Sequence, residues 1–156
     1  DLRHIRIALP CSWKTKNIVG SLYGGSLFAI TDGAHPMMLM AALGEAYVVW
    51  DKSASIRYRK PGYTTLYADF SIDEAELACI REQLLCHPEL ERTYTIELKD
   101  GQGTVHTVVE RTVYIAEKNY YRKKSGGDKD ADNTLDPGDL QPRPQPATGL
   151  QHGTGT

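Results

Sequence analysis

The chain has 156 residues, of which 40% are hydrophobic, and this is enough for one globular domain with its own core. Its 18 Lys and Arg residues nearly balance its 20 Asp and Glu residues, which gives a net charge of −2. A charge so close to zero provides no basic surface for nucleic acid or for an anionic membrane, and we expect neither as a partner.

The composition also indicates a compartment. The three cysteines form an odd set without CxxC spacing, which is typical of free thiols in a reducing environment. The most apolar run, residues 27–43, is interrupted by charged and helix-breaking residues, and no cationic and then apolar signal peptide opens the sequence. We therefore expect a soluble cytoplasmic protein.

The first elements along the chain are a strand, a loop and a long helix. Residues 4–10 alternate apolar and polar side chains and end at a proline, which predicts a strand. Residues 11–22 have the composition of a loop. Residues 24–43 are apolar on nearly every side, which predicts one long helix at the centre of the core. Within it, Pro36 would clash with the carbonyl group of Asp32, so we expect a kink there.

Strand patterns dominate the next part of the chain. Residues 48–58 and 66–72 alternate with period two on either side of a Pro-Gly-Tyr turn, and this predicts a hairpin. Residues 74–86 carry apolar residues at helical spacing and predict a short amphipathic helix. Residues 94–98 and 105–115 alternate around a Gly-rich turn and predict a second hairpin.

This order of elements predicts an α+β fold in a single domain, residues 1–120. Short hairpins favour antiparallel pairing, and one five-stranded antiparallel sheet wrapped around the long helix would bury both apolar surfaces. Residues 121–156 are rich in Pro, Gly, Asp and Thr and cannot bury enough apolar surface to offset their ordering entropy. We expect them to form an inert, disordered tail.

A single carboxylate, Asp32, lies inside the predicted buried helix. A lone buried charge is unfavourable unless it is paired or used in a reaction. Two interpretations follow. Asp32 is either a catalytic group or a structural carboxylate paired with Lys52, which falls on the inward-facing parity of its predicted strand.

Five short motifs, in order and at matching spacing, resemble the hotdog-fold thioesterases, and in detail their PaaI-like branch. They are Asn17, Gly20, the Tyr23-Gly24-Gly25 triplet, Asp32, and an apolar-x-aromatic pattern that runs from Ile56 through Tyr58 to Pro61-Gly62. The resemblance covers residues 3–117 and implies the hotdog fold. One departure is clear, because the family has a histidine where this chain has Tyr23.

The resemblance also implies an activity, the hydrolysis of an acyl thioester, in particular acyl-coenzyme A, to a free acid and a thiol. It implies a homodimer, alone or paired into a tetramer, in which the glycine end of the helix and the carboxylate come from different subunits. Asp32 would be the general base or nucleophile, and the Gly24 and Gly25 amides would form the oxyanion hole. Asn17 would orient the carbonyl group or the water molecule.

Each of these roles has a structural alternative. The two glycines also suit close packing of the helix on the sheet, and Asn17 also suits a loop turn. Further candidates for substrate contact lie beside the motifs or at strand ends, and these are Tyr23, Ser26, Thr31, Arg57, Arg59 and Lys60. The three cationic residues among them would either meet the phosphates of coenzyme A or remain solvated at the sheet edge.

Three other functions are compatible with the same residues. One is a non-catalytic module that binds acyl-CoA or a fatty acyl group, which is favoured if Tyr23 blocks the carbonyl position. Another is a hydratase or dehydratase, for which His35 is the candidate catalytic histidine, and the third is a structural dimerisation domain. The five histidines lack metal-ligand spacing, so we expect no metal, and no cofactor besides the coenzyme A of the substrate.

Overall fold

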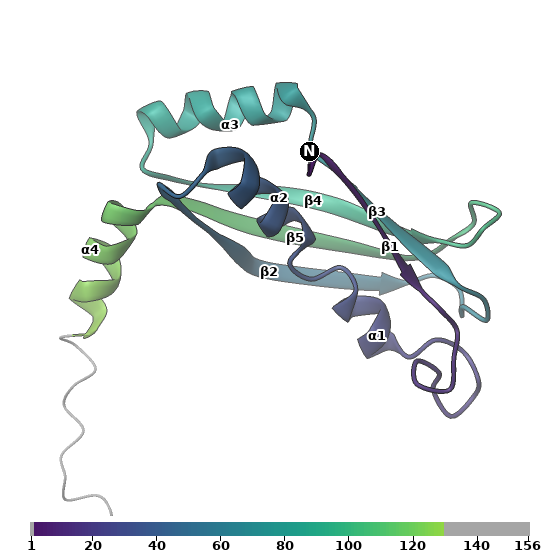
Figure 1. Ribbon diagram of the computed structural model, residues 1–156. Coiled ribbons are helices and arrows are strands. Elements are labelled where there is room, and N and C mark those ends of the chain that lie inside the picture. The colour runs from purple at the N-terminus through teal and green to yellow at the C-terminus, as the bar shows by residue number, and fades with distance from the viewer. Residues whose placement is uncertain (1, 130–156) are drawn as a thin grey trace, which may run out of the picture.

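The structure of the protein, a computed structural model, describes residues 2–129. In chain order the elements are β1 (His4–Leu9), α1 (Gly24–Ala29), α2 (Ala34–Leu43), β2 (Tyr47–Tyr58), β3 (Leu66–Ser71), α3 (Glu74–Cys86), β4 (Glu89–Lys99), β5 (Val105–Glu117) and α4 (Lys118–Lys129). The strands form one antiparallel sheet in the order β1-β3-β4-β5-β2 (Figure 1). The expected five-stranded antiparallel sheet, and the short helix between its third and fourth strands, are confirmed.

One strand pairing differs from the prediction. The hairpin of residues 48–58 with 66–72 does not form, because β2 pairs with β5, and β3 pairs with β1 and β4. The 12-residue β2 lies along the 13-residue β5, whereas the 6-residue β3 lies along the 6-residue β1. Strands of equal length leave few backbone groups unpaired, which favours this arrangement. The second predicted hairpin, β4 with β5 around residues 100–104, is confirmed.

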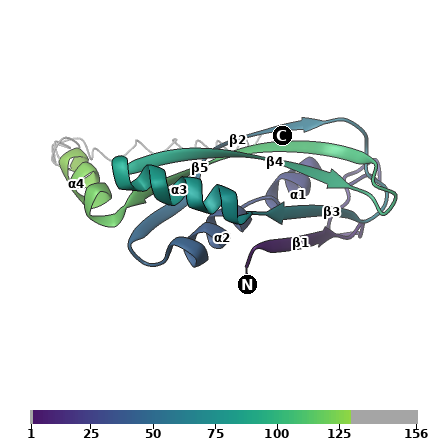
Figure 2. The ribbon, with the colours of Figure 1, turned by 90° about the horizontal axis from the view of Figure 1, so that it is seen from above.

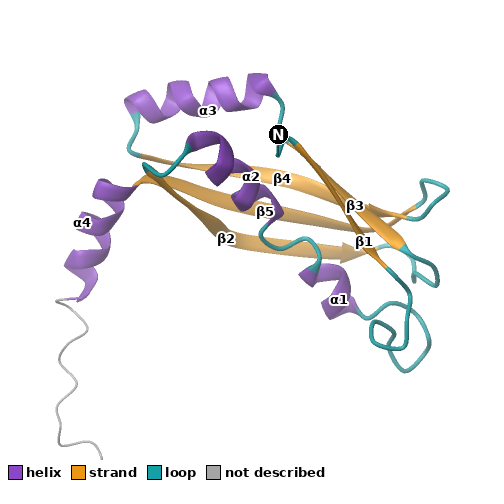
Figure 3. Cartoon of the chain, viewed as in Figure 1, coloured by secondary structure: helices purple, strands orange, loops and turns teal. Residues whose placement is uncertain are grey.

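The predicted long helix is divided into two helices (Figure 3). Residues 30–33 separate α1 from α2, so the expectation of one continuous helix over residues 24–43 is wrong. Gly33 precedes α2 with a φ of 74°, a left-handed conformation that glycine adopts without steric penalty. Pro36 then falls in the first turn of α2, where its missing N–H leaves no helical bond unmade. The kink expected at Asp32 is therefore a complete break, which places Asp32 outside both helices.

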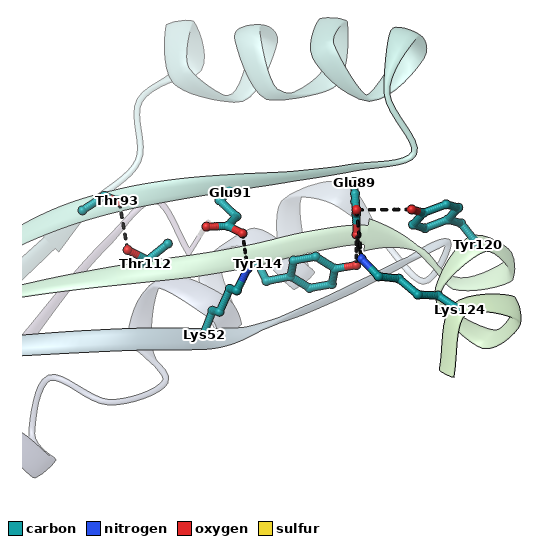
Figure 4. Close-up of polar contacts among 8 residues, drawn as sticks. All are labelled: Lys52, Glu89, Glu91, Thr93, Thr112, Tyr114, Tyr120 and Lys124. Atoms are coloured by element: carbon teal, nitrogen blue, oxygen red, sulfur yellow. Dashed lines mark hydrogen bonds and ion pairs between the residues drawn. The ribbon is translucent and has the colours of Figure 1, made fainter. Parts of the chain in front are cut away.

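A β-bulge in β2 decides which of its side chains point inward. The register with β5 shifts immediately after Asp51, so the alternation changes phase at Lys52. Val49 and Asp51 consequently point toward the interior, whereas Lys52 is exposed and pairs with Glu91 of β4 (Figure 4). The predicted inward position of Lys52, and with it the alternative of an Asp32–Lys52 pair, is wrong.

The chain continues after β5 as α4, which is anchored to the end of the sheet. Glu89 at the start of β4 accepts hydrogen bonds from Tyr120 at 3.2 Å and from Lys124 at 2.7 Å (Figure 4). Residues 121–129 are helical, so the expectation of a disordered tail that begins at residue 121 is wrong there. The segment has few apolar residues, and the contacts with Glu89 hold it against the sheet. The rest of that prediction, residues 130–156, lies outside the described residues.

The loops near α1 lie at the end of the molecule opposite to α4 (Figure 1). Seen from above, α4 lies at one end and the β4–β5 turn at the other (Figure 2). The loops of residues 10–23 and 59–65, together with α1, lie toward the same end as that turn (Figure 1). Of the helices in residues 2–129, none combines the length and the apolar composition that a bilayer-spanning helix needs.

Candidate active site

Asp32 lies in the break between α1 and α2, and an arginine holds its carboxylate. Arg111 of β5 donates from Nη1 to Oδ1 of Asp32 at 2.9 Å. The Asp32 side chain is 66% exposed, whereas that of Arg111 is only 4% exposed. The carboxylate is therefore not a lone buried charge, and it remains accessible to solvent.

Arg111 is the centre of a polar cluster beneath the break. Besides Asp32 it donates to Oδ2 of Asp51 at 3.1 Å, to Oγ1 of Thr31 at 3.0 Å and to the carbonyl oxygen of Phe28 at 3.2 Å. The guanidinium also lies over the Phe28 ring, 4.6 Å from its centroid. The Phe28 carbonyl belongs to the last turn of α1, so the cation satisfies an end-of-helix acceptor. A buried guanidinium requires such a set of acceptors for its donors.

Asp51 is the second carboxylate of this cluster. Its Oδ2 accepts from Arg111 and, at 3.2 Å, from the N–H of Gly33, whereas its Oδ1 is buried and has no hydrogen-bond partner within residues 2–129. Burial is the main cause that raises the pKa of the Asp51 carboxyl; Asp32 adds to this effect, and the Gly33 N–H and Arg111 oppose it. Two acids in different surroundings thus share one cation, with Asp51 sheltered and Asp32 open to solvent.

Sequence reasoning missed both Arg111 and Asp51. Arg111 stands at an inward position of β5, between the fully buried Val109 and Val113, and that alternation is a signal that an arginine faces the core. Asp51 offered no comparable signal. The bulge at Lys52 reverses which side chains of the strand point inward, and the sequence pattern does not reveal a bulge.

The two glycines open α1 with free N–H groups. Within residues 2–129 neither the Gly24 amide nor the Gly25 amide has a hydrogen-bond acceptor. Each glycine also accommodates a tyrosine side chain: a Cβ on Gly24 would lie 2.7 Å from Oη of Tyr58, and a Cβ on Gly25 would overlap Cε1 of Tyr23. The two glycines therefore do allow close packing, here against two tyrosine rings, and their N–H groups remain without an acceptor among residues 2–129.

A groove of about 440 Å³ begins at this end of α1. It brings Asn17 and Gly24 together with Tyr58, Arg59 and Lys60, which come from the first loop, from α1 and from the end of β2. A helix end, a phenol and two cations in one groove suit an anionic ligand that also carries a carbonyl group. Four of the predicted site residues thus meet, and Tyr58 joins them.

The Asn17 side chain is committed to its own loop. Its Oδ1 accepts from the N–H groups of Val19 and Ser21, both at 3.1 Å, and its Nδ2 donates to Oγ of Ser21 at 2.8 Å. This geometry favours the loop-turn interpretation over an orienting contact with substrate. Asn17 therefore contributes to the groove chiefly by fixing the shape of its wall.

The remaining predicted residues lie elsewhere. Thr31 is buried, and its hydroxyl is used within the polar cluster, where it donates to the Phe28 carbonyl oxygen and accepts from Arg111. Ser26 is half-buried, and Arg57 lines a separate depression on β2 and β5. Tyr23 is exposed beside the glycines. Asp32 does not line the groove, so one subunit does not bring the carboxylate and the Gly24 amide into one cavity.

His35 is unsuited to acid–base chemistry. The ring is stacked on Tyr94, with centroids 4.1 Å apart, and meets the edge of Phe70; its Nδ1 has no partner within residues 2–129. Burial, reinforced by the charge of Arg111, lowers the pKa of His35 to about 4. The hydratase interpretation, which relied on His35, therefore loses its catalytic histidine.

Acid should destabilise the fold through His35. Because its pKa in the folded chain lies below the ordinary value, the unfolded chain binds the proton first, and stability is lost as the pH falls from about 6.5 towards 4. We expect the free energy of unfolding to drop by about 3 kcal/mol over that range. Urea denaturation at several pH values measures it. His35→Phe should remove this part of the pH dependence, whereas His87→Asn, at an exposed histidine, should not.

Comparisons with known proteins agree with this architecture. A family model described as a domain of unknown function, DUF4442, matches residues 1–115. A probable thioesterase of unknown function from Pseudomonas aeruginosa superposes with a TM-score of 0.65 at 18% identity, over 74% of this chain and 77% of that chain. A thioesterase from Haemophilus influenzae gives 0.55 at 13% identity, over 74% and 73%.

A protein from Bacillus halodurans, solved with CoA, gives a TM-score of 0.54 at 19% identity, over 70% of this chain and 66% of that chain. At these identities the likeness establishes the fold, which is the hotdog fold that the sequence motifs resembled. The search of curated proteins returned no match.

Proposed function

Since the chain belongs to the DUF4442 family, whose function is unknown, and has the hotdog fold, we propose that it hydrolyses an acyl thioester to a free acid and a thiol. The observation that carries this proposal is the groove, which joins the open Gly24 amide to a phenol and two cations. A thioester needs donors for its oxyanion, and acyl-coenzyme A adds phosphates that suit Arg59 and Lys60. The similar protein solved with CoA supports this carrier. The reaction requires no further cofactor.

The donors for the oxyanion are the Gly24 and Gly25 amides. They stand at the positive end of α1, and the absence of a Cβ lets a substrate approach the backbone closely. Oη of Tyr58 lies beside Gly24 and offers a further donor. One such donor typically contributes about 2.7–4 kcal/mol of transition-state stabilisation.

Asp32 is the general base of the proposed reaction. Water attacks the carbonyl carbon while Asp32 takes its proton, and the C–S bond then breaks to release a thiolate, which is protonated. Arg111 holds the carboxylate in place. Because Asp32 is exposed and does not line the groove of its own subunit, we place the complete site in a homodimer, with the groove from one subunit and the carboxylate from the other.

A non-catalytic acyl-CoA-binding module is the second candidate. The ion pair of Asp32 with Arg111 favours it, because a carboxylate held by a guanidinium is a weaker proton acceptor. The Tyr23 ring beside Gly25 favours it as well, since it narrows access to that amide. Thiol release from a panel of acyl-CoA esters separates the two functions: tight binding without release would identify the module.

Removing the two cations should weaken the binding of acyl-CoA selectively. We expect Arg59→Gln with Lys60→Gln to raise KM for acyl-CoA about tenfold or more, since each charged hydrogen bond contributes about 1.5–3 kcal/mol. KM for the matching acyl-N-acetylcysteamine thioester, which has no phosphates, should stay the same. Arg57→Gln removes a charge outside the groove and should change neither value. Equal effects on both substrates would contradict the phosphate role.

A further inference from the structure

His106, at the start of β5, holds the wall of the groove through its side chain and its backbone. Its Nδ1 lies 3.1 Å from the carbonyl oxygen of Pro61, and its Nε2 lies 3.2 Å from Oδ2 of Asp100. Its own carbonyl oxygen accepts from the N–H groups of Arg59 at 2.9 Å and Lys60 at 3.1 Å. The side chain is largely buried, with 12% exposed. Three consecutive residues of the groove wall are thus fixed by one histidine.

Both groups that face the ring are acceptors. The Pro61 carbonyl has no proton to give, and Asp100 is ionised, because the Thr104 N–H, with His106 and the Gln102 N–H, holds the pKa of that carboxyl below its usual range. A neutral imidazole has one N–H and therefore satisfies only one of the two. Both contacts are hydrogen bonds only when the ring carries two protons and a positive charge.

The contacts continue from His106 to the glycine end of α1. Pro61 and Gly62 line the groove beside Gly24, and the Gly62 carbonyl accepts from the N–H of Leu22 at 2.8 Å. Leu22 stands two residues before Gly24 in the chain. A shift of the Pro61 carbonyl is therefore passed to the wall of the groove and to the segment that leads into α1.

We propose that His106, as an imidazolium bridging Asp100 and Pro61, is a positioning residue that keeps the groove in the shape that binds an anionic thioester. We call these three residues the His106 latch. The substrate part of this inference rests on the proposed function, whereas the latch itself rests on the contacts. After loss of one ring proton, the remaining N–H stays with the ionised Asp100, and the other ring nitrogen, now an acceptor, faces the Pro61 carbonyl oxygen. The contact with Pro61 is then lost, and His106 holds the loop only through the bonds of its carbonyl with Arg59 and Lys60.

The latch makes binding depend on the protonation state of the His106 ring. Asp100 from the β4–β5 turn faces the ring, and Arg59 and Lys60, which follow β2, meet the His106 carbonyl oxygen through their backbone amides. Higher pH removes a positive charge and a hydrogen bond together. We expect the affinity for coenzyme A to weaken about five- to tenfold as the ring deprotonates.

Asp100→Asn is the matched variant. Asparagine keeps the Oδ1 acceptor used by the N–H groups of Gln102 and Thr104, and its Nδ2 can donate to a neutral ring. A neutral His106 then donates from Nδ1 to Pro61 and accepts at Nε2, so the latch stays closed without a charge. The phosphate of the ligand titrates near pH 6 in both proteins and cancels in the comparison.

The experiment combines ¹⁵N NMR with calorimetric binding of coenzyme A in wild type, Asp100→Asn and His87→Asn. We expect the wild-type His106 ring to carry two N–H groups at low pH, and the Leu22 amide shift and the dissociation constant to follow its titration. In Asp100→Asn the Leu22 amide shift and the dissociation constant should no longer depend on the protonation of His106. His87→Asn should behave as wild type. A ring with one proton throughout, or a Leu22 amide that ignores the titration, overturns the inference. If the Leu22 amide shift follows the protonation of the His106 ring but coenzyme A does not bind, the result supports the latch and counts against the proposed function.

Discussion

Asp32→Asn should lower thiol release from acyl-CoA by about 10²–10⁴-fold, the range expected when a general base is removed. The amide keeps the size of the side chain and an acceptor for Arg111 but does not take a proton from water. Because Asp32 is 66% exposed, its ion pair contributes at most about 1 kcal/mol, and the free energy of unfolding should change little. Turnover and urea denaturation, measured on the same preparations, give both numbers.

The control for this result is Asp69→Asn. Asp69 is also a partly exposed aspartate paired with an arginine, Arg6, but it lies on β3. It undergoes the same chemical change and should retain full turnover. Unchanged turnover in Asp32→Asn, with binding of acyl-CoA intact, would remove Asp32 from the mechanism and favour the binding module. A large loss of stability would instead identify a structural carboxylate.

Arg111→Met should destabilise the fold by about 3–5 kcal/mol, the usual effect of removing one partner from a buried ion pair. The substitution leaves Asp51, whose Oδ1 has no hydrogen-bond partner among residues 2–129, as an uncompensated buried charge. It also removes the donors to the Phe28 carbonyl oxygen in α1 and to Thr31 in the break after it, which tie both segments to β5. Urea denaturation at about pH 7 measures the loss.

The loss in Arg111→Met should also depend on pH, and this identifies its cause. The pKa of Asp51 is raised by burial even beside Arg111, and it should rise further without the cation. The folded chain then holds the proton more tightly than the unfolded chain, so the variant should recover stability as the pH falls. Adding Asp51→Asn to Arg111→Met should restore part of the stability at neutral pH. A loss that is the same at all pH values and in the double variant would contradict this explanation.

Turnover of Arg111→Lys separates the support of Asp32 from the fold. Lysine keeps the charge, but its single nitrogen does not reach the four acceptors that the guanidinium fork meets. We therefore expect a smaller loss of stability than in Arg111→Met, together with lower turnover, because Asp32 is less firmly held.

The amino-acid pattern was sufficient to predict much of this fold. Alternation and helical spacing located the five strands, the amphipathic helix at 74–86 and the hairpin around residues 100–104, because burial on one face leaves a periodic trace in the sequence. Gly24 was identified through the resemblance to the hotdog-fold thioesterases, and Arg59 and Lys60 were identified as cations near a strand end; the structure brings all three into one groove. The sequence also showed that Asp32, a carboxylate within an apolar segment, must be paired or used in a reaction.

Other features required the tertiary structure. Pairing of β2 with β5, instead of β3, depends on contacts between segments far apart in the chain, and local alternation is the same for either partner. The break between α1 and α2 depends on Gly33 and Pro36 acting together, where the sequence indicated only a kink. The His106 latch joins two loops that no local pattern relates.

The sequence by itself determined where the five strands and the helix at residues 74–86 lie, the glycine pair that opens α1 and the fact that Asp32 must be paired or used. Only the tertiary structure decided that the partner is Arg111, 79 residues away, and that Asp51 shares it. The physical reason is the bulge at Lys52, because one extra residue reverses which side chains of a strand point inward. The alternation of the sequence predicted that Lys52 points inward and Asp51 outward, and the folded sheet has the opposite arrangement.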